Sequence, residues 1–491
     1  MDALESWLAG ADADLWTWAV FPLVAVLAVY FTIRTGVVQI RLLPRMFRTL
    51  GDRTPTDAEG RTQSLSAFQA FTVSAASRVG IGNIAGVGTA IAVGGPGAVM
   101  WMWVMALFGA SASFVEATLA QLYKHRDPDG FRGGPAYYIH RGLRSRWLGV
   151  AFAVMLIVSS PLAVNSLQAF TVVESLELSV GDTLPLPVTV TLAAVLAAMT
   201  ASVIFGGARR IALFTETLVP AMALLYLALG VVIVVIHADQ LGAVLAEIFH
   251  DAVTGEAVAG GALGTVIVTG VQRGMFSSEA GLGTAPNAAA TAATTHPVKQ
   301  GLVQSLGVYF DTLLVCTITA MIVLIPRPDL ASAEPGISLT HDAVVDSLGG
   351  WSGYLLTGIV FLLAFSTILG LYYYGESNLE FISERRDLLL AYRVLAIAAV
   401  FVGCLLSAQL LWTVADVLVG LLAVINLIAI GLLSPLAFGL LRHYSAQLRA
   451  GRDPVFTRDQ LPAARGVEVW EDEQTVTGLP PQAREEPPPG R

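Results

Sequence analysis

Two long apolar segments of the chain contain glycine and polar residues where a plain membrane anchor would have neither. The first reads SAASRVGIGNIAGVG and holds Gly80, Gly82 and Asn83, and the second reads QRGMFSSEAGLGTAPNAAA and holds Gly281 and Gly283. A helix that breaks at such a place exposes free N–H groups at one new end and free carbonyls at the other, which suit an anion and a cation. Because lipid does not tolerate bare backbone, two breaks predict a buried site. Close packing of helices through small residues is the alternative for either segment alone.

The composition indicates which elements hold these segments. Of 491 residues, 55% are hydrophobic and 13% are charged, whereas about 25% are charged in soluble globular proteins. The formal net charge is -9, and no tract rich in Lys and Arg forms a nucleic-acid footprint. These values argue against most soluble enzymes and against nucleic acid as a partner. They predict an all-α polytopic membrane protein of the cell inner (plasma) membrane.

Hydropathy predicts eleven transmembrane helices, because about 20 apolar residues cross the hydrocarbon layer. They lie at about 15–33, 64–93, 97–122, 148–170, 187–205, 211–236, 263–292, 300–326, 351–375, 388–410 and 415–440. The loops after the first and third helices are basic and the alternate loops are acidic, which predicts an N-terminus outside and a C-terminus in the cytoplasm. Acidic residues before the first helix argue against a signal peptide.

The last ten of these helices form two blocks, 64–236 and 263–441, with five helices each. Five is an odd number, so the second block is inverted relative to the first, and each block begins with a glycine-interrupted helix. This pattern indicates a secondary transporter with its site near the bilayer midplane. Residues 1–63 then add one transmembrane helix and a basic cytoplasmic loop. The polar residues 450–491, rich in Pro, Gln, Glu and Arg, are expected to form a disordered cytoplasmic tail.

Three stretches resemble the alanine or glycine:cation symporter family, part of the amino acid-polyamine-organocation superfamily. They read GNIAGVGTAIAVGGPGAVMWMWV, RGGPAYYIHRGL and GVQRGMFSSEAGLGTAPNAAATAATTHPVKQGLVQSLGVYFDTLLVCT, and the resemblance extends over about residues 15–445. It implies a leucine-transporter type of fold with five plus five inverted helices. It also implies uptake of alanine or glycine coupled to Na+, or in some members to H+. Ser278 and Asn287 depart from the family pattern, in which Asn and His are common at those positions.

An amino acid of this kind is a zwitterion and needs separate seats for its two charges. The first broken helix is expected to bind the carboxylate through free amides, where the helix dipole adds to direct hydrogen bonds. The second is expected to bind the ammonium through free carbonyls, beside a glycine-lined wall that suits a small substrate. The residues assigned to the carboxylate are Gly80, Gly82 and Asn83, and those assigned to the ammonium and the wall are Phe276, Ser277, Gly281 and Gly283.

Asn165 and Gln168 lie three residues apart on the fourth predicted helix and therefore share one helix face. Both could point into the cavity, and the family resemblance favours Gln168 as a substrate ligand. The alternative is a hydrogen bond between helices, worth about 0.6 kcal/mol on average.

Ser366 and Thr367 form a hydroxyl pair on the ninth predicted helix. In the fold implied by the resemblance, such a pair completes a sodium site with carbonyls of the first broken helix, here those of Arg78, Val79 and Ile81. Sodium prefers hard oxygen ligands of this type. The alternative for each hydroxyl is a hydrogen bond back to the preceding helical turn.

The ionisable side chains within the predicted helices include Arg78, Glu116, Arg273, Glu279 and Asp311. Each costs at least about 2.5 kcal/mol at a helix centre unless it is paired or hydrated. We therefore expect structural pairing, with Arg78 beside Glu116 or Asp311 and with Glu279 on free amides at the second break. Gating by making and breaking such pairs is the second interpretation.

Ion-coupled symport is the predicted function, and an ion channel and a membrane enzyme are the alternatives. Channels of this size usually build a pore from several subunits. An enzyme finds no support, since the sequence has no HExxH motif, no GxSxG motif followed by a membrane histidine and no paired intramembrane aspartates. Cys316 and Cys404 lie in apolar runs and are expected to be inert thiols. The expected ligands are a small amino acid and Na+, without a cofactor.

Overall fold

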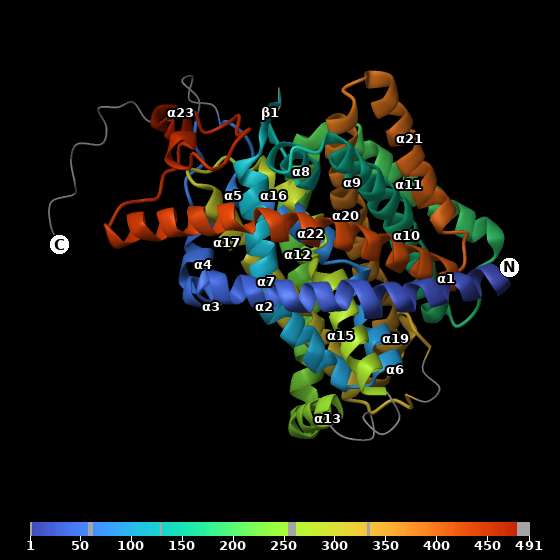
Figure 1. Ribbon diagram of the computed structural model, residues 1–491. Helices are drawn as coiled ribbons and strands as arrows, with labels where there is room; N and C mark the ends of the chain where they lie inside the picture. Colours follow the sequence, from blue (N-terminus) through green and yellow to red (C-terminus); the bar gives the residue numbers. More distant parts are fainter. Residues whose placement is uncertain (1, 57–61, 128–129, 254–261, 331–333, 479–491) are drawn as a thin grey trace.

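The computed structural model describes residues 2–56, 62–127, 130–253, 262–330 and 334–478. Most of this chain is helical, and a short antiparallel pair of strands, β1 (His125–Asp127) and β2 (Gly130–Arg132), follows one long helix. Figure 1 shows long helices that cross the molecule, with α13 at one end and α8 and α23 toward the opposite end.

Within the described residues, fifteen helical elements lie between Asp2 and Ile236. They are α1 (Asp2–Leu15), η1 (Trp16–Val20), α2 (Phe21–Thr35), α3 (Val38–Arg41), α4 (Leu43–Leu50), α5 (Ala67–Arg78), η2 (Ile81–Asn83), α6 (Ala85–Gly94), α7 (Gly97–Leu122), α8 (Pro135–Gly142), α9 (Arg146–Val158), η3 (Ser159–Val164), α10 (Asn165–Val180), α11 (Leu186–Ile204) and α12 (Gly207–Ile236).

The described helices after Ile236 likewise include long helices and short interruptions. They are η4 (Ala238–Gln240), α13 (Leu241–Val253), α15 (Ala262–Ser278), α16 (Pro286–Thr291), α17 (Pro297–Val308), η5 (Tyr309–Val315), α18 (Cys316–Leu324), α19 (Ser338–Leu348), α20 (Trp351–Ile382), α21 (Arg386–Gly403), α22 (Ala408–Arg449), η6 (Arg458–Gln460) and α23 (Glu473–Thr477).

Apolar length defines the membrane-crossing elements. Within the described residues, eight helices are long and apolar enough to cross a membrane, or nine if the bent pair of α5 and α6 is counted as one span. Each of the eleven segments predicted from hydropathy coincides with a helix or with an interrupted helix, while eleven as the number of crossings stays a prediction. Some large apolar side chains lie on the surface: Trp18 is 77% exposed and Ile33 is 69% exposed. This exposure is expected of surfaces that face lipid.

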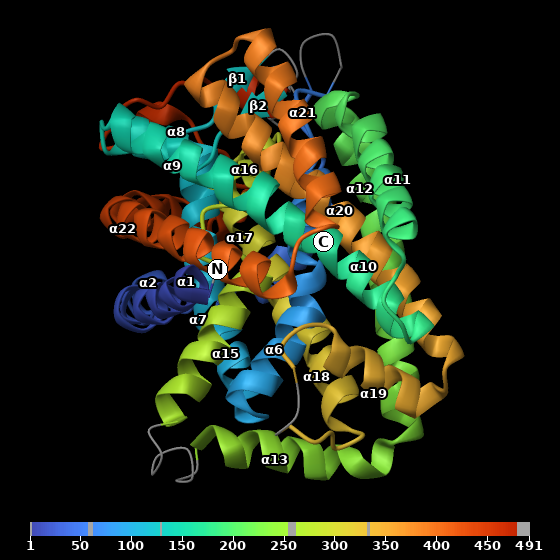
Figure 2. The same ribbon diagram turned by 90° about the vertical axis from the view of Figure 1, so that its right-hand side faces the viewer.

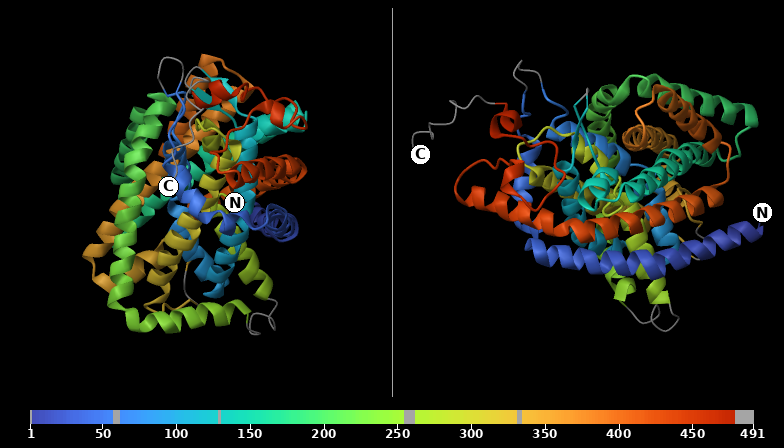
Figure 3. Two further views of the ribbon diagram at one scale, coloured as in Figure 1. Left: turned by 90° about the vertical axis from the view of Figure 1, so that its left-hand side faces the viewer. Right: turned by 45° about the horizontal axis from the view of Figure 1, so that its top comes forward.

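Several long helices of the two predicted blocks pack in pairs. The second helices of the two blocks, α7 and α17, pack together, as do the third helices, α10 and α20, and the fourth helices, α11 and α21. Equivalent elements meet in this way when two blocks are related by a pseudo-twofold axis. Figure 2 shows α10 and α20 side by side near the middle of the molecule, and Figure 3 shows the green helices α11 and α12 along one flank.

The helix that precedes the repeats packs on their outside. The continuous rod formed by α1, η1 and α2 runs beside α22 (Figure 1). One hydrogen bond fixes this contact, from the indole Nε1 of Trp16 to the backbone carbonyl of Asp416 at 3.2 Å. The rod therefore packs against α22 and α7 from outside the two predicted blocks.

Residues 450–478 differ from the disordered tail that we predicted from Ala450. Trp470 is only 1% exposed, and its indole donates a hydrogen bond to the carbonyl of Gln121 at 3.0 Å. The backbone N–H of Phe456 donates to the carbonyl of Thr295 at 2.9 Å. These aromatic side chains anchor a segment whose average composition is polar, which is why composition alone suggested disorder. The remainder of the predicted tail, 479–491, lies outside the described residues.

Candidate substrate and cation site

The first interrupted helix breaks where the glycines predicted it. Helix α5 ends at Arg78, helix α6 begins at Ala85, and the two halves are bent by 61°. Gly80 is required for a close approach, because a Cβ atom at this position would lie 2.3 Å from Oγ1 of Thr367 on α20. A Cβ at Gly82 would similarly lie 3.1 Å from the ring of Phe276 on α15. The glycines thus bring two other helices against the bare backbone of the break.

Neutral amide side chains satisfy the free N–H groups of this break. Gly80 donates its backbone N–H to Oδ1 of Asn83, and Ile81 donates to Oε1 of Gln168, both at 3.3 Å. The N–H of Gly80 also donates to the carbonyl of Arg78, at 2.9 Å. Gln168 therefore reaches the break from α10. Asn165 on the same helix instead donates its side-chain amide to the carbonyl of Ile368 at 3.3 Å, which is the interhelical role that we considered as its alternative.

The second interrupted helix breaks between α15, which ends at Ser278, and α16, which begins at Pro286. Three of the intervening residues have positive φ, namely Glu279 (56°), Gly281 (82°) and Gly283 (81°). Glycine adopts this left-handed backbone without strain, whereas a residue with a Cβ does so rarely. The GLG sequence therefore ends α15 and links it to α16 through non-helical backbone.

A buried carboxylate satisfies the free N–H of the second break. The backbone N–H of Gly281 donates to Oε1 of Glu116 at 3.2 Å. Asn426 donates its side-chain amide to Oε2 of Glu116 at 2.8 Å and to the carbonyl of Gly281 at 2.9 Å. We expected Glu279 to bind these amides, but its carboxylate instead accepts a hydrogen bond from the hydroxyl of Tyr374 at 3.4 Å. The free amide is instead bound by a residue of α7.

A cavity of about 30 Å³ lies between the two breaks, which is room for about two water molecules. An amino acid is larger, so binding requires the surrounding side chains to move. Three predicted substrate residues line the cavity, namely Gly82, Gln168 and Phe276. The other lining residues are Ser77, Arg78, Ser160, Val164, Glu279, Leu282, Thr284, Leu371 and Val419.

The sequence patterns did not indicate several of these lining residues. Leu282 and Thr284 stand inside the glycine-rich motif of the second break, so their position could have been read from it. The apolar residues Val164, Leu371 and Val419 carry no such signal, because an apolar side chain within a span is ordinary. Gly283 faces away from the cavity, since a Cβ there would lie 2.7 Å from Cγ of Asn426.

Asp311 links the two breaks. Its carboxylate accepts a hydrogen bond from the side-chain amide of Asn83 on the first break. It also accepts one from the hydroxyl of Ser277, on the last turn of α15, at 2.8 Å. Two predicted substrate residues on separate interrupted helices are thus held by one carboxylate from η5.

The predicted cation residues divide into two groups. Thr367 Oγ1 donates to the carbonyl of Ala76 on α5 at 2.9 Å and so lies beside the first break. Ser366 bonds back to the carbonyl of Leu363 at 2.8 Å, which is the alternative that we weighed for it. Of the predicted carbonyls, those of Arg78 and Ile81 accept backbone N–H groups of Gly80 and Ile84. Ala76, which the sequence did not indicate, is the carbonyl in contact with Thr367.

The intramembrane cations also have defined partners. Arg78 donates to the backbone carbonyl and the side-chain Oε1 of Gln304, at 3.2 and 2.9 Å, instead of to Glu116 or Asp311. Arg273 forms two hydrogen bonds with the carboxylate of Asp416, at 3.1 and 2.6 Å. The expected pairing of Arg273 therefore occurs, and its partner is Asp416 of α22.

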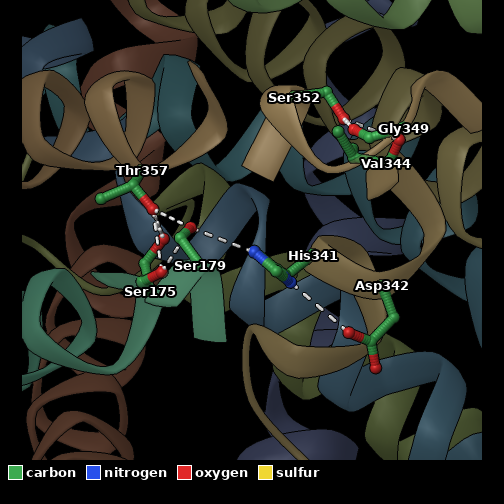
Figure 4. Close-up of polar contacts among 8 residues, drawn as sticks. All are labelled: Ser175, Ser179, His341, Asp342, Val344, Gly349, Ser352 and Thr357. Atoms are coloured by element: carbon green, nitrogen blue, oxygen red, sulfur yellow. Dashed lines mark hydrogen bonds and ion pairs between the residues drawn. The ribbon is translucent and has the colours of Figure 1, made fainter. Parts of the chain in front are cut away.

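A second polar cluster lies away from the cavity, where α10, α19 and α20 meet (Figure 4). Ser179 contacts Nε2 of His341 at 3.1 Å, and Nδ1 of His341 lies 3.4 Å from Asp342. The hydroxyl of Ser179 also lies 2.8 Å from that of Thr357 and 3.0 Å from the carbonyl of Ser175. A serine shared among so many partners serves as a connection between helices, and this cluster fastens α19 to α10 and α20.

Two interrupted helices that lead two inverted blocks and meet at a buried polar cavity define the class of secondary transporters. The chain belongs to the sodium:alanine symporter family, whose model matches residues 1–458. This confirms the resemblance seen in the sequence and assigns the chain to a family of sodium-coupled amino-acid symporters.

Curated relatives match over nearly the whole chain. The amino-acid carrier protein AlsT of Bacillus subtilis is 45% identical, over 94% of this chain and 96% of its own length. The probable sodium/glutamine symporter GlnT of the same organism is 43% identical, over 96% and 98%. The sodium/alanine symporter AgcS of Methanococcus maripaludis is 38% identical, over 85% and 92%.

A solved structure shares the fold. The crystal structure of MhsT in complex with L-phenylalanine matches with a TM-score of 0.57 at 14% identity, and covers 84% of this chain and 95% of that one. At this identity the match establishes the fold, which is the leucine-transporter type that we predicted.

Proposed function

We propose that the protein carries a small neutral amino acid, alanine or glycine, into the cell together with Na+ by alternating access. The observation that carries the proposal is the pair of interrupted helices from inverted blocks that face one buried cavity. Each break supplies free backbone groups, which suit the opposite charges of a zwitterion and its coupling ion. The family and the names of the relatives support both Na+ and an amino acid as ligands. Since one relative is named for glutamine, glutamine is the first competitor to test.

In this proposal the substrate carboxylate binds at Gly80, Gly82 and Asn83. It takes the place of the side-chain oxygens of Asn83 and Gln168 on the N–H groups of Gly80 and Ile81. Those two bonds are 3.3 Å long, beyond the usual range of about 2.7–3.2 Å, so their exchange costs little. The exchange requires Gln168 to turn and thereby opens room in the cavity.

The ammonium binds at the end of α15, next to the carbonyls of Phe276 and Ser277. The helix dipole is negative at this end and favours a cation. Gly281 and Gly283 shape the adjoining segment, and the carbonyl of Gly281 already accepts a hydrogen bond from Asn426. The two charged ends of the amino acid thus contact different interrupted helices.

Na+ binds between α5 and α20, at the hydroxyls of Thr367 and Ser366 and at carbonyls of the first interrupted helix. The contact between Thr367 and Ala76 supports this location, because it already joins one hydroxyl to one free carbonyl. Sodium at this position fixes the distance between α5 and α20 and so pre-forms the carboxylate seat. The ion is cargo that drives uptake, and binding of either ligand favours binding of the other.

The protein lies in the cell inner (plasma) membrane with the N-terminus outside and the C-terminus in the cytoplasm. The basic loops support this orientation. An ion pair of 2.8 Å between Arg141 and Glu468 joins the second basic loop to residues 450–478. This contact supports a location of both segments on the same side of the membrane.

A proton-coupled carrier is the second candidate. Asp311 favours it, because a carboxylate that contacts both breaks could take up H+ in place of Na+. The test is [14C]alanine uptake into proteoliposomes with Na+ or with choline outside at fixed pH. Na+-dependent, saturable uptake supports the proposal, whereas uptake that is equal in choline and rises with an inward H+ gradient supports the proton.

Counterflow distinguishes a carrier from a channel in the same vesicles. Internal unlabelled alanine accelerates entry of labelled alanine through a carrier. Conductance without such exchange would contradict the symporter. Unlabelled glycine and glutamine, added at equal concentration, show which side chains the site accepts.

A further inference from the structure

We propose that Glu116 is the positioning residue of the transport site, which holds the second break in its binding shape without touching the substrate. The proposal rests on the proposed function. Glu116 is fully buried on α7, and it does not line the cavity between the breaks. It contacts Gly281, whereas Glu279 and Leu282 on either side of this glycine do line the cavity. Glu116 therefore supports the second break from the side that faces away from the cavity.

The donors around Glu116 require it to present two acceptors. Oε1 accepts the backbone N–H of Gly281, and Oε2 accepts the side-chain amide of Asn426. The amide of Asn426 is oriented by a third residue, since its Oδ1 accepts the hydroxyl of Tyr138 on α8. If Glu116 were protonated or replaced by an amide, it would present a hydrogen-bond donor to the N–H of Gly281 or to the amide of Asn426, which are donors themselves. The geometry therefore fits a carboxylate anion, which its hydrogen bonds stabilise away from water.

Gly281 depends on this support because a left-handed residue cannot make the hydrogen bonds of a continuing helix. Its N–H goes to Glu116 and its carbonyl to Asn426, so both backbone groups are satisfied by the same pair. A buried backbone group without a partner is costly. Loss of the carboxylate would therefore release the loop 279–285 from its observed conformation and move the lining residues.

The test compares reconstituted wild type with Glu116→Gln, Asn426→Asp and the double variant. Ser113→Ala is the matched control, since Ser113 is buried on the same helix and its hydroxyl has no hydrogen-bond partner within the described part of the chain. Each variant is assayed for its alanine KM, its kcat per reconstituted protein and its thermal unfolding midpoint in detergent.

We expect Glu116→Gln to raise the alanine KM by about tenfold or more, because one of two hydrogen bonds becomes a contact between donors. Asn426→Asp alone is expected to be worse, since it sets two carboxylates against each other. The double variant restores a donor and an acceptor between these positions and should bind alanine better than Asn426→Asp alone. Ser113→Ala should keep the wild-type KM.

Three results would overturn the proposal. The first is an unchanged KM in Glu116→Gln, and the second is a double variant whose loss equals the sum of the single losses. The third is a variant with a lower unfolding midpoint and less protein but a normal KM, which would make Glu116 a structural residue only. If Glu116→Gln does not fold, Asn426→Ala takes its place, and a wild-type KM there contradicts the inference. Wild type without uptake would instead refute the proposed function.

Discussion

The two interrupted helices differ in what binds their free backbone groups. At the first break the partners are all neutral, namely the side-chain amides of Asn83 and Gln168 at 3.3 Å and the backbone carbonyl of Arg78, which accepts the N–H of Gly80 at 2.9 Å. At the second break the partner is the carboxylate of Glu116, and the bonds of the network measure 2.8 to 3.2 Å. Charge-assisted hydrogen bonds are roughly twice as strong as neutral ones. The first break can therefore exchange its partners for a substrate, while the second keeps a fixed shape.

The same contrast extends to the arginines of the two helices. Arg78, before the first break, binds the neutral side chain of Gln304, whereas Arg273, on α15, forms an ion pair with Asp416. The second interrupted helix is thus anchored by charge at two levels, through Glu116 and through Asp416. Four changes test this comparison, one through protein stability and three through uptake, and the three uptake effects run from the largest expected to the smallest.

Gly80→Ala should abolish transport. The added Cβ would lie 2.3 Å from Oγ1 of Thr367, so α20 must separate from the first break and the carboxylate seat must widen. We expect alanine uptake to fall by roughly 100-fold or more, which corresponds to about 2.7 kcal/mol. Gly86→Ala is the control, because a Cβ there meets nothing within 4 Å. Normal uptake by Gly80→Ala, or equal loss in both variants, would contradict this assignment.

Arg273→Leu should destabilise the protein by about 3–5 kcal/mol, because it leaves the carboxylate of Asp416 buried without its partner. The two side chains are 9% and 4% exposed, so water cannot replace the pair. The double change Arg273→Leu with Asp416→Leu should recover much of the loss. Thermal unfolding in detergent measures both, and a single variant as stable as the double would show that the pair does not anchor α15.

Thr367→Ala should raise the Na+ concentration for half-maximal uptake by about tenfold, equivalent to about 1.4 kcal/mol. Ser366→Ala should change it less, because the hydroxyl of Ser366 bonds back to its own helix and not to α5. The measurement is alanine uptake against Na+ at constant ionic strength. Identical curves for Thr367→Ala and wild type would remove Thr367 from the sodium site.

Gln168→Glu should raise the alanine KM by about fivefold, since one net hydrogen bond is worth about 1 kcal/mol. Its carboxylate would compete with that of the substrate for the N–H of Ile81. Asn165→Ala should instead lower stability and leave the KM unchanged, because Asn165 bonds to α20. A KM that responds to Asn165 and not to Gln168 would reverse the roles given to the two residues.

Most of the fold could be predicted from the sequence because its signals are local. Runs of apolar residues defined the long helices, and the clustered glycines marked both breaks to within a few residues. The residues that contact each break were harder to predict from the sequence. Glu116 and Gly281 are 165 positions apart, and nothing in the spacing of either shows that they meet. Ala76 contacts Thr367 through its backbone carbonyl. Every residue has this group, so the residue type gives no signal.

Residues 450–478 show the limit of an argument from composition. The segment is polar on average, yet two aromatic residues, Phe456 and Trp470, are buried against the ends of membrane helices. A few buried aromatic side chains can offset the ordering entropy of a short segment that also forms ion pairs. The average over the whole tail hides this.

The most direct measurement of the central claim is equilibrium binding of [14C]alanine to the purified protein at rising Na+, with choline keeping the ionic strength constant. If the interrupted helices form one site shared by the amino acid and the ion, the Kd for alanine falls as Na+ increases, and alanine tightens Na+ binding by the same factor. Gly82→Leu, which would fill the space against Phe276, should show no binding at any Na+ concentration. Alanine binding of equal strength in choline and in Na+, or unaltered binding by Gly82→Leu, would contradict the account.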